Sequence, residues 1–460
     1  MQVWVSAPYF SADVAQLVEQ RFRKPWVEGS IPPVGYNKMS KFKNLFTNRN
    51  FILLWLGQII SQWGDRLGQI ALIAFVYERS PGSPLEMAKI LSFTIIPVFL
   101  IGPIAGVYVD RWDRRKTMFV TDFLRSILVL IIPLFLFRLG SDIPLYIVIF
   151  LIFCIGRFFV PAKLAIIPDL VQEKELLLTN SLVNTTGMIA AVLGFGLGGI
   201  LVEWWSSQAG FYLDALSFFI SAILILLINP RKIITSLPKD FAQQSSRFVK
   251  DISKSVIQEI KEGIGYIVKV KEVRFTTGIL FLLWSALGSV YVVLIVFIQN
   301  ALQSATKDLG LLIMFLGLGL FLGTVIYGRF GQKFSLYKAM FVFLFLSGFQ
   351  LIVFTLVLNK FPDFAVASVL VVLLGIVISP IMNIANTLIH SASQTEMRGK
   401  VFSSLEIVIH FAFLIFMFIS SFIAEYFNAT SVMVIVGSLL CVVSVYNLVK
   451  KQLINDPFKG

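Results

Sequence analysis

Twelve apolar runs recur along the 460 residues of this chain, separated by short segments that hold most of the charged side chains. A helix needs about 17–25 apolar residues to cross a bilayer core of roughly 30 Å, and these runs have that length. We therefore predict an all-α integral membrane protein with twelve transmembrane helices. The runs are 51–77, 87–109, 117–139, 143–160, 179–202, 209–228, 275–299, 309–327, 337–358, 364–388, 401–423 and 430–448.

The composition excludes most other classes of protein. Hydrophobic residues make up 57% of the chain and charged residues 14%, whereas soluble domains have about 45–50% and about 25%. Disordered, collagen-like and disulfide-rich chains are excluded as well. Because Cys154 and Cys441 lie far apart inside apolar runs, we expect no disulfide, metal site or cofactor.

The net charge of +13 could indicate a nucleic-acid partner, so the positions of the basic residues matter. They gather in alternate connections, and the positive-inside rule places such connections in the cytoplasm. We therefore predict a multi-pass protein of the inner (plasma) membrane with both termini cytoplasmic, and membrane lipids rather than nucleic acid as the partner of this charge. The basic connections contain Arg111, Arg114, Arg115 and Lys116, ten Lys or Arg between residues 231 and 274, and Arg329 with Lys333.

The longest polar connection, 229–274, separates six runs from six. It predicts two pseudo-symmetric six-helix bundles, 39–228 and 275–449, joined by a cytoplasmic linker and followed by a cytoplasmic tail at 450–460. Apolar residues repeat every four positions in the linker, which predicts an amphipathic helix on the inner membrane surface. An ordinary hinge with one helical patch explains the pattern equally well. The repeat consists of Phe248, Ile252, Val256, Ile260 and Ile264.

Residues 1–38 match neither a signal peptide nor a spanning segment, because charged side chains interrupt every apolar stretch. The stretch 14–35 resembles the peptide obtained when a transfer-RNA gene is translated. We expect the physiological start to be Met39, with residues 1–38 a non-native or disordered extension. Peptides from upstream of Met39 in the native protein would contradict this expectation.

The sequence contains no Gly-rich phosphate loop and no cluster of metal ligands, so it favours neither nucleotide hydrolysis nor metal chemistry. Ion-gradient-driven or passive transport remains, which fits two six-helix repeats around a midplane site. A membrane enzyme would need convergent His, Asp or Cys, and a sensor would need a soluble output domain. Neither is visible, so we expect a transporter and not an enzyme.

The loop after the second run carries the most specific local pattern, GVYVDRWDRRKTM at 106–118. Gly106 would allow close approach of a helix, and Asp110 can accept N–H groups at the start of a neighbouring helix. Arg111, Arg114 and Arg115 can pair with carboxylates on a facing helix. We expect a gate here; a basic loop without a gating role is the alternative.

This loop resembles the signature of the major facilitator superfamily. The resemblance implies that it locks the cytoplasmic side in the outward-facing state, with the Asp against the start of the eleventh run at 401–404. We expect Asp169, at the junction of the fourth and fifth runs, as a further partner of the loop. Asp113 stands where the family usually has Gly, and the loop 324–334 is a weaker second copy, with Gly328 in place of Asp110.

Several phrases resemble the branch of that superfamily with macrolide-efflux and enterobactin-exporter-type proteins: 50–67, 110–118, 211–222, 259–274 and 396–404. The resemblance implies export of an amphipathic small molecule, macrolide-like or siderophore-like, in exchange for protons by alternating access. An uptake system or a lipid transporter of the same fold is the alternative. Each chain holds both halves of a pathway, so we expect a monomer.

Exporters of this kind commonly carry a Gly-Pro pair in the fifth span. Here Phe195 stands where the Pro would be, within the stretch 187–199 that contains five glycines. The departure weakens the inference of proton exchange. Tight helix packing is the favoured role of these glycines.

Polar residues inside the runs are candidates for the site, because a charge at the bilayer centre costs about 2.5 kcal/mol or more. In the first run, polar residues spaced 4, 3 and 4 apart share one helical face: Gln58, Gln62, Asp65 and Gln69. We predict that they line a cavity in which Asp65, with Arg66 beside it, binds substrate or a proton. The alternative is a structural Asp65 paired with Arg66 or with a neighbouring helix.

Arg157 in the fourth run, and Glu406 with His410 in the eleventh, are further candidates for binding substrate or protons. Glu406 and His410 lie one turn apart, so they could share a proton. Hydrogen bonding at a gate explains them equally well. For Asp214 and Asn180 we expect hydrogen bonds that hold helices together.

Overall fold

The computed structural model describes residues 45–109, 111–135, 137, 142–229, 258, 260–331, 335–392 and 398–451. Within these ranges it contains twelve long helices and no strand, which confirms the predicted fold class. The first half consists of α4 (Arg49–Arg79), α5 (Pro84–Val109), α6 (Arg114–Phe135), α7 (Ile143–Leu170), α8 (Leu176–Trp205) and α9 (Ser207–Leu226). The second consists of α11 (Lys271–Leu302), α12 (Lys307–Phe330), α13 (Leu336–Lys360), α14 (Phe364–Ala392), α15 (Arg398–Tyr426) and α16 (Ala429–Lys451).

Helix boundaries agree with the predicted runs to within a few residues, with one exception. The fourth run was expected to end at 160, but α7 continues to Leu170 with Pro161 and Pro168 inside it. Proline removes one backbone hydrogen bond, yet membrane helices tolerate it where neighbouring helices support the backbone. The added turns carry Lys163 and Asp169 toward the end of the bundle.

Polar side chains fix where several helices begin. A side-chain oxygen at the helix start accepts a backbone N–H that has no partner within the helix. Asn48 accepts from the N–H groups of Asn50 and Phe51 at the start of α4. The same role is filled by Asp113 for α6, Ser206 for α9, Asp363 for α14 and Asn428 for α16.

Eleven of the twelve helices are long and apolar enough to cross a membrane by length and composition. The twelfth is α4, whose middle carries the polar stripe with Asp65 and Arg66. These side chains lower the hydropathy of α4. The helix that does not meet this measure is therefore the one that holds Asp65.

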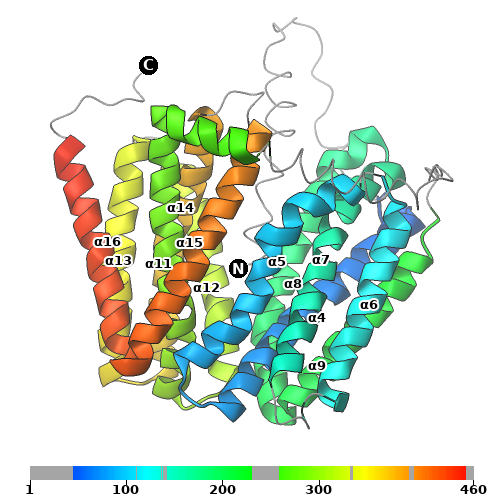
Figure 1. Ribbon diagram of the computed structural model, residues 1–460, viewed down its shortest axis with the longest axis horizontal. Helices are drawn as coiled ribbons and strands as arrows, with labels where there is room; N and C mark the ends of the chain where they lie inside the picture. The colour runs from blue at the N-terminus through cyan, green and yellow to red at the C-terminus, as the bar shows by residue number, and fades with distance from the viewer. Residues whose placement is uncertain are drawn as a thin grey trace, which may run out of the picture.

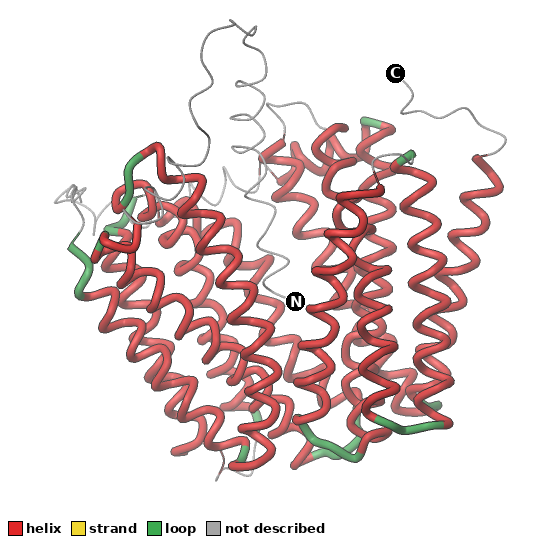
Figure 2. The backbone as a smooth tube through the Cα atoms, turned by 180° about the vertical axis from the view of Figure 1, so that it is seen from behind, coloured by secondary structure: helices red, strands yellow, loops and turns green. Residues whose placement is uncertain are grey.

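The helices form two six-helix groups that lie side by side (Figures 1 and 2). In the first group α9 packs on α4 and α6, and in the second α12 packs on α14 and α11 on α15. Between the groups, α8 packs on α12 and α5 packs on α15. The fifth helix of each half thus contacts the second helix of the other, as a pseudo-twofold axis between the halves requires.

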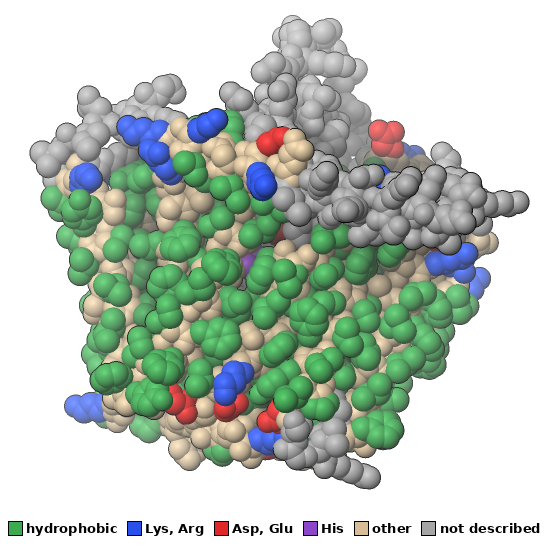
Figure 3. Space-filling view, in the orientation of Figure 1, with side chains coloured by type: hydrophobic (Ala, Val, Ile, Leu, Met, Phe, Trp, Pro, Cys, Tyr) green, Lys and Arg blue, Asp and Glu red, His purple; other side chains and the backbone are tan. Residues whose placement is uncertain are grey.

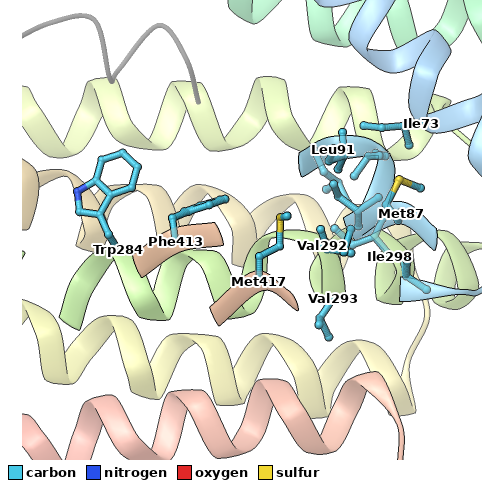
Figure 4. Close-up of a cluster of buried hydrophobic side chains, with 14 of the residues drawn as sticks. Ile73, Met87, Leu91, Trp284, Val292, Val293, Ile298, Phe413 and Met417 are labelled. Atoms are coloured by element: carbon cyan, nitrogen blue, oxygen red, sulfur yellow. The ribbon is translucent and has the colours of Figure 1, made fainter. Parts of the chain in front are cut away.

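The two ends of the molecule differ. We call the end at which α9 finishes and α11 begins the linker end, and the other, at which α4 joins α5 and α11 joins α12, the far end. The linker end is uppermost in Figure 1, where the two groups of helices diverge toward it and converge toward the far end. Buried apolar side chains from both halves form one cluster there, including Met87 and Leu91 of α5, Val292 and Ile298 of α11, and Met417 of α15 (Figure 4).

Gly106 makes no close helix contact with the described residues in this conformation, and its role in a gate stays a prediction. No described atom lies within 4 Å of the position that a Cβ would take at Gly106, and the same holds for Gly102 one turn earlier.

A broad apolar belt covers the face shown in Figure 3, with Lys and Arg along its upper edge. Large apolar side chains are exposed in both halves, such as Phe135 on α6, Phe321 on α12 and Leu439 on α16. Exposed apolar surface of this extent is suited to lipid contact. The basic edge lies at the linker end.

Only part of the connection between the halves is described. Residues 260–269 are helical, and Val270 separates this helix from α11. Ile267 packs with Val273 and Val401 in a small buried cluster. Ser404 at the start of α15 donates a hydrogen bond to the carbonyl oxygen of Ile260 at 3.1 Å. Phe248, Ile252 and Val256 of the predicted repeat, residues 1–38 and Asp110 lie outside the described residues.

Candidate functional site

An ion pair between α4 and α6 lies at the centre of the candidate site. Arg125 Nη2 donates to Asp65 Oδ1 at 2.7 Å. The Asp65 side chain is 20% exposed and that of Arg125 is 8% exposed. The carboxylate is therefore reachable from one side, while its partner is held inside the first half.

The surroundings of Arg125 fix its guanidinium. The Phe218 ring lies beneath it, with 3.9 Å from Cζ to the ring centroid, an arrangement that favours a cation. Gly156 of α7 faces it, and a Cβ there would lie 3.4 Å from Cζ. Arg125 Nη1 also lies 3.9 Å from Asp122 Oδ1. The cation thus stands between two carboxylates, and three helices enclose it.

Asp122 is fully buried (0% exposed) on α6. Its Oδ2 accepts a hydrogen bond of 2.6 Å from Ser221 Oγ of α9, while Oδ1 has no hydrogen-bond partner among the described residues. A buried carboxylate without full pairing is costly. Arg125 and Ser221 are the groups that offset this cost.

Asp214 of α9 is a third buried carboxylate. It packs against bare backbone of α4, because a Cβ at Gly68 would overlap its carboxyl group and a Cβ at Gly64 would overlap Ser217. Asp214 Oδ1 has no hydrogen-bond partner among the described residues. Oδ1 therefore does not make the expected hydrogen bond between helices. At this point α9 packs directly against the glycine backbone of α4.

Arg66 does not pair with Asp65, contrary to one of the two alternatives weighed for Asp65. It is buried, its Nη1 donates to Gln69 Oε1 at 3.0 Å, and its guanidinium lies 5.5 Å from the centroid of the Phe195 ring. Gly194 of α8 makes room for it, since a Cβ there would lie 2.9 Å from Arg66 Cβ. The partner of Asp65 comes instead from a neighbouring helix.

The rest of the polar stripe packs inward. Gln58 is only 3% exposed, and its Oε1 has no hydrogen-bond partner in the described part of the chain. Gln62 fills the space over Gly187 of α8, where a Cβ would lie 2.8 Å from Gln62 Oε1. Gln58 is therefore buried in this conformation, where α8 packs against α4, and its cavity-lining role stays a prediction.

The other ionisable candidates lie on α7 and α15. His410 Nδ1 is hydrogen-bonded to the main-chain carbonyl of Glu406 at 2.7 Å, and its ring centroid lies 5.3 Å from that of Trp284. The contact that joins this pair thus uses backbone and not the Glu406 carboxylate. Arg157 Nε is buried without a hydrogen-bond partner among the described residues.

At the linker end, Arg114 Nη1 lies 2.7 Å from Asp169 Oδ2, so the expected contact is present. The pair joins the start of α6 to the end of α7. Asp113, which departs from the family signature, accepts a hydrogen bond from the Lys116 N–H at 2.9 Å and so caps α6. Arg111 is exposed and Arg115 is half-buried.

Asp122 and Arg125 were not predicted as site residues, although the sequence contained a signal for both. They lie three residues apart inside the run 117–139, and the cost of a charge in the membrane applied to them as it did to Asp65. Only the fold shows that Arg125, and not Arg66, pairs with Asp65.

The sequence model of the Major Facilitator Superfamily matches residues 54–303 and 275–453 of this chain. An uncharacterised MFS-type transporter of Bacillus subtilis, YfiS, is 27% identical over 229 residues, which are 50% of this chain and 52% of the relative. The match therefore spans about half the length of that relative. Macrolide efflux protein A of Streptococcus pyogenes is 22% identical over 417 residues, or 88% of this chain and 96% of that protein.

Solved structures of low sequence identity share the fold. A bacterial homologue of the iron transporter ferroportin, in an inward-facing state, superposes with a TM-score of 0.65 at 18% identity. The superposition covers 87% of this chain and 98% of that one.

Proposed function

The chain belongs to the major facilitator superfamily of transporters, and from this premise we propose that it exports an amphipathic small molecule in exchange for protons. The observation that carries the proposal is the ion pair of Asp65 and Arg125, a partly exposed carboxylate held by a buried cation between two membrane helices. A proton-coupled transporter needs a group of this kind, which can exchange its counter-ion for a proton.

Protonation of Asp65 would remove the charge that Arg125 pairs with. Arg125 would then be left with Asp122 at 3.9 Å as its nearest carboxylate, and the contact between α4 and α6 would weaken. In this scheme the proton changes how two helices of the first half pack. Proton binding and helix movement are thereby linked through one side chain.

The topology in this proposal places the linker end in the cytoplasm. The basic edge seen in Figure 3 lies at that end, as the positive-inside rule requires. Both termini are then cytoplasmic and the protein lies in the cell's inner (plasma) membrane, surrounded by membrane lipids. Because the halves meet at the far end, the conformation described is inward-facing.

An amphipathic substrate fits the contrast between the two halves. The first half supplies the ion pair of Asp65 and Arg125, whereas the second contains a pocket lined almost entirely by apolar side chains, including Leu283, Val290, Leu351 and Met382. The direction of transport is proposed from the relative named macrolide efflux protein A. A single chain contains both halves, so it would work as a monomer. Uptake of a substrate, or lipid transport, is the alternative.

The loop between α5 and α6 is proposed as the cytoplasmic gate. Its basic residues Arg111, Arg114 and Arg115 stand at the linker end, and the pair of Arg114 with Asp169 holds the loop against α7. In the outward-facing state Asp110 would meet the start of α15. The loop would then join the two halves at the end where they are now apart.

The test is pH-driven transport in proteoliposomes. A labelled macrolide and a labelled siderophore are measured separately with an imposed pH gradient. The proteins compared are wild type, Asp65→Asn, Glu406→Gln and the control Glu86→Gln, whose half-buried side chain pairs with Lys89 within one turn of α5. We expect Asp65→Asn to lose gradient-driven transport and Glu86→Gln to keep it. If both Asp65→Asn and Glu406→Gln retain full pH-driven transport, neither group carries the coupling proton.

A further inference from the structure

Glu203 joins the two halves at the far end. It lies near the end of α8, and its Oε2 accepts hydrogen bonds from Ser304 Oγ at 2.8 Å, from the Thr306 N–H at 2.9 Å and from the Lys307 N–H at 2.7 Å. Thr306 is the N-cap of α12 and Lys307 is its first residue. A carboxylate of the first half therefore caps a helix of the second.

Glu425 makes the reciprocal contact. It lies near the end of α15, and it accepts hydrogen bonds from Ser83 Oγ at 3.0 and 3.1 Å and from the Leu85 N–H at 3.2 Å. Pro84 begins α5 and has no N–H of its own, so Leu85 provides the first available donor of that helix. A carboxylate of the second half thus caps a helix of the first.

The two caps are related by the pseudo-twofold axis. In each cap, a glutamate near the end of the fifth helix of one half contacts the start of the second helix of the other half. The start of a helix has unpaired N–H groups and a partial positive charge, which makes a carboxylate its matched partner. Because the relation occurs twice, it belongs to the interface between the halves and not to one loop.

Close backbone contact surrounds the Glu203 cap. Thr306 Oγ1 donates to the Gly199 carbonyl oxygen at 3.0 Å, and a Cβ at Gly199 would lie 2.5 Å from the Thr306 carbonyl oxygen. A Cβ at Gly310 would overlap the carbonyl oxygen of Phe195. Hydrogen bonds join the two halves at both junctions.

We propose that Glu203 and Glu425 form a paired lock that keeps the far end closed, and that release of both caps accompanies its opening during transport. Hydrogen bonds of about 3 Å exist only while the halves touch, so the caps stabilise the inward-facing state and contribute nothing to the outward-facing one. Both carboxylates are exposed at the surface. Water can therefore replace their N–H partners when the far end opens, which makes the lock reversible.

This inference goes beyond the proposed export, because it concerns the balance between two conformations and holds for any substrate or coupling ion. Removal of a capping side chain typically changes a helix-linked equilibrium by about fivefold. The caps lie at separate junctions without shared partners, so their effects should multiply to roughly 25-fold. A shift of this size changes a strongly inward-facing population into a measurable mixture.

Distances between spin labels test the lock directly. One pair, Gln208→Cys and Lys360→Cys, spans the halves at the far end, and a second pair, Lys116→Cys and Lys338→Cys, spans them at the linker end. All four positions are exposed. The native Cys154 and Cys441 are first replaced by Ser. Pulsed electron paramagnetic resonance in lipid nanodiscs then compares wild type with Glu203→Ala, Glu425→Ala and the double variant.

The matched control is Asp363→Ala. Asp363 also caps a helix at the far end with its carboxylate, accepting from the Val366 N–H at 3.0 Å, but that helix, α14, belongs to its own half. We expect the double variant to lengthen the far-end distance and shorten the linker-end distance, with each single variant shifting the populations less. Asp363→Ala should leave both distance distributions unchanged.

Unchanged distributions in the double variant, or an equal shift in Asp363→Ala, would overturn the proposal. If the double variant fails to fold, Glu203→Gln with Glu425→Gln keeps the side-chain size and removes only the charge; a smaller shift in the same direction is then expected, and no shift contradicts the lock. The distances are read without substrate or pH gradient. A negative result in the transport assay therefore leaves this test unaffected.

Discussion

Arg125 Nη2 lies 2.7 Å from Asp65 Oδ1, and this contact ties the third helix of the first half to the first. The contact pairs one buried cation with one partly exposed carboxylate inside that half. Arg125 is shared with Asp122, while Asp214 faces glycine backbone. Arg125 alone therefore cannot neutralise all three carboxylates in this region, Asp65, Asp122 and Asp214.

Replacing Arg125 by Lys should destabilise the protein although the charge is kept. An ammonium group cannot place a planar fork between Asp65 and Asp122 or lie flat on the Phe218 ring. We expect the free energy of unfolding to fall by about 1–3 kcal/mol, seen as a lower Tm in detergent. Arg115→Lys, at the half-buried linker-end position, should change Tm little; an equal loss in both would argue against a special environment at Arg125.

Reversing the charges of Arg114 and Asp169 tests their pairing. Arg114→Asp and Asp169→Arg should each slow transport, because like charges then face each other at the gate loop, and the double exchange should restore most of the rate. The pair is partly exposed, so its share of stability is only about 0.5–1 kcal/mol. The rate of substrate transport in proteoliposomes measures the effect.

The comparison for that prediction is the partly exposed pair of Glu86 and Lys89, which lies within one turn of α5. Exchanging its charges should leave the rate near that of wild type. If the exchange of Arg114 and Asp169 fails to restore transport, the contact between them has no part in gating.

Gly64→Ala should be strongly destabilising. A Cβ at this position would overlap Ser217, so α4 and α9 would have to separate, at a cost of about 1–3 kcal/mol. The added substitution Ser217→Gly should recover part of the lost Tm. At Gly278 of α11 no described atom lies within 4 Å, and Gly278→Ala should be neutral or stabilising. Equal effects at the two glycines would exclude helix contact as the cause.

Removing the hydroxyl of Ser221 should leave Asp122 Oδ2 without its donor. Ser221→Ala should therefore lower the free energy of unfolding by about 1–3 kcal/mol, as for other lost hydrogen bonds to buried charged groups. Ser181→Ala is the matched control, because the exposed Ser181 hydroxyl bonds only to the Leu177 carbonyl of its own helix. Thermal unfolding in detergent compares the two, and a loss of equal size would contradict the role of Ser221.

Most of the fold could be predicted from hydropathy, because each membrane helix must satisfy its own backbone and so must be a long apolar run. The misplaced end of α7 shows where this reasoning stops. Pro161 and Lys163 interrupt the apolar pattern, but neighbouring helices keep the backbone helical through Leu170. The composition of this segment alone does not show that neighbouring helices will support it.

The candidate site was predictable only in part. The position of Asp65 near the middle of a span identified it, whereas its partner Arg125 is 60 residues away along the chain and depends on how α6 packs against α4. The caps at Glu203 and Glu425 were not foreseen, since both lie at helix ends, where acidic residues are common. Their partners belong to the opposite half, and no repeating pattern in the sequence links a glutamate to a partner so far away along the chain.

The weak hydropathy of α4 has a consequence for biogenesis. Of the described helices, α4 is made first, and Asp65 and Arg66 each add about 2.5–3.5 kcal/mol to its cost of insertion near the helix centre. Arg125, on α6, is synthesised only after another whole helix has followed. We therefore expect α4 to be weakly inserted in the membrane until α6 is made and Arg125 can pair with Asp65. Nascent chains that end before α6 should be preferred substrates of membrane quality control.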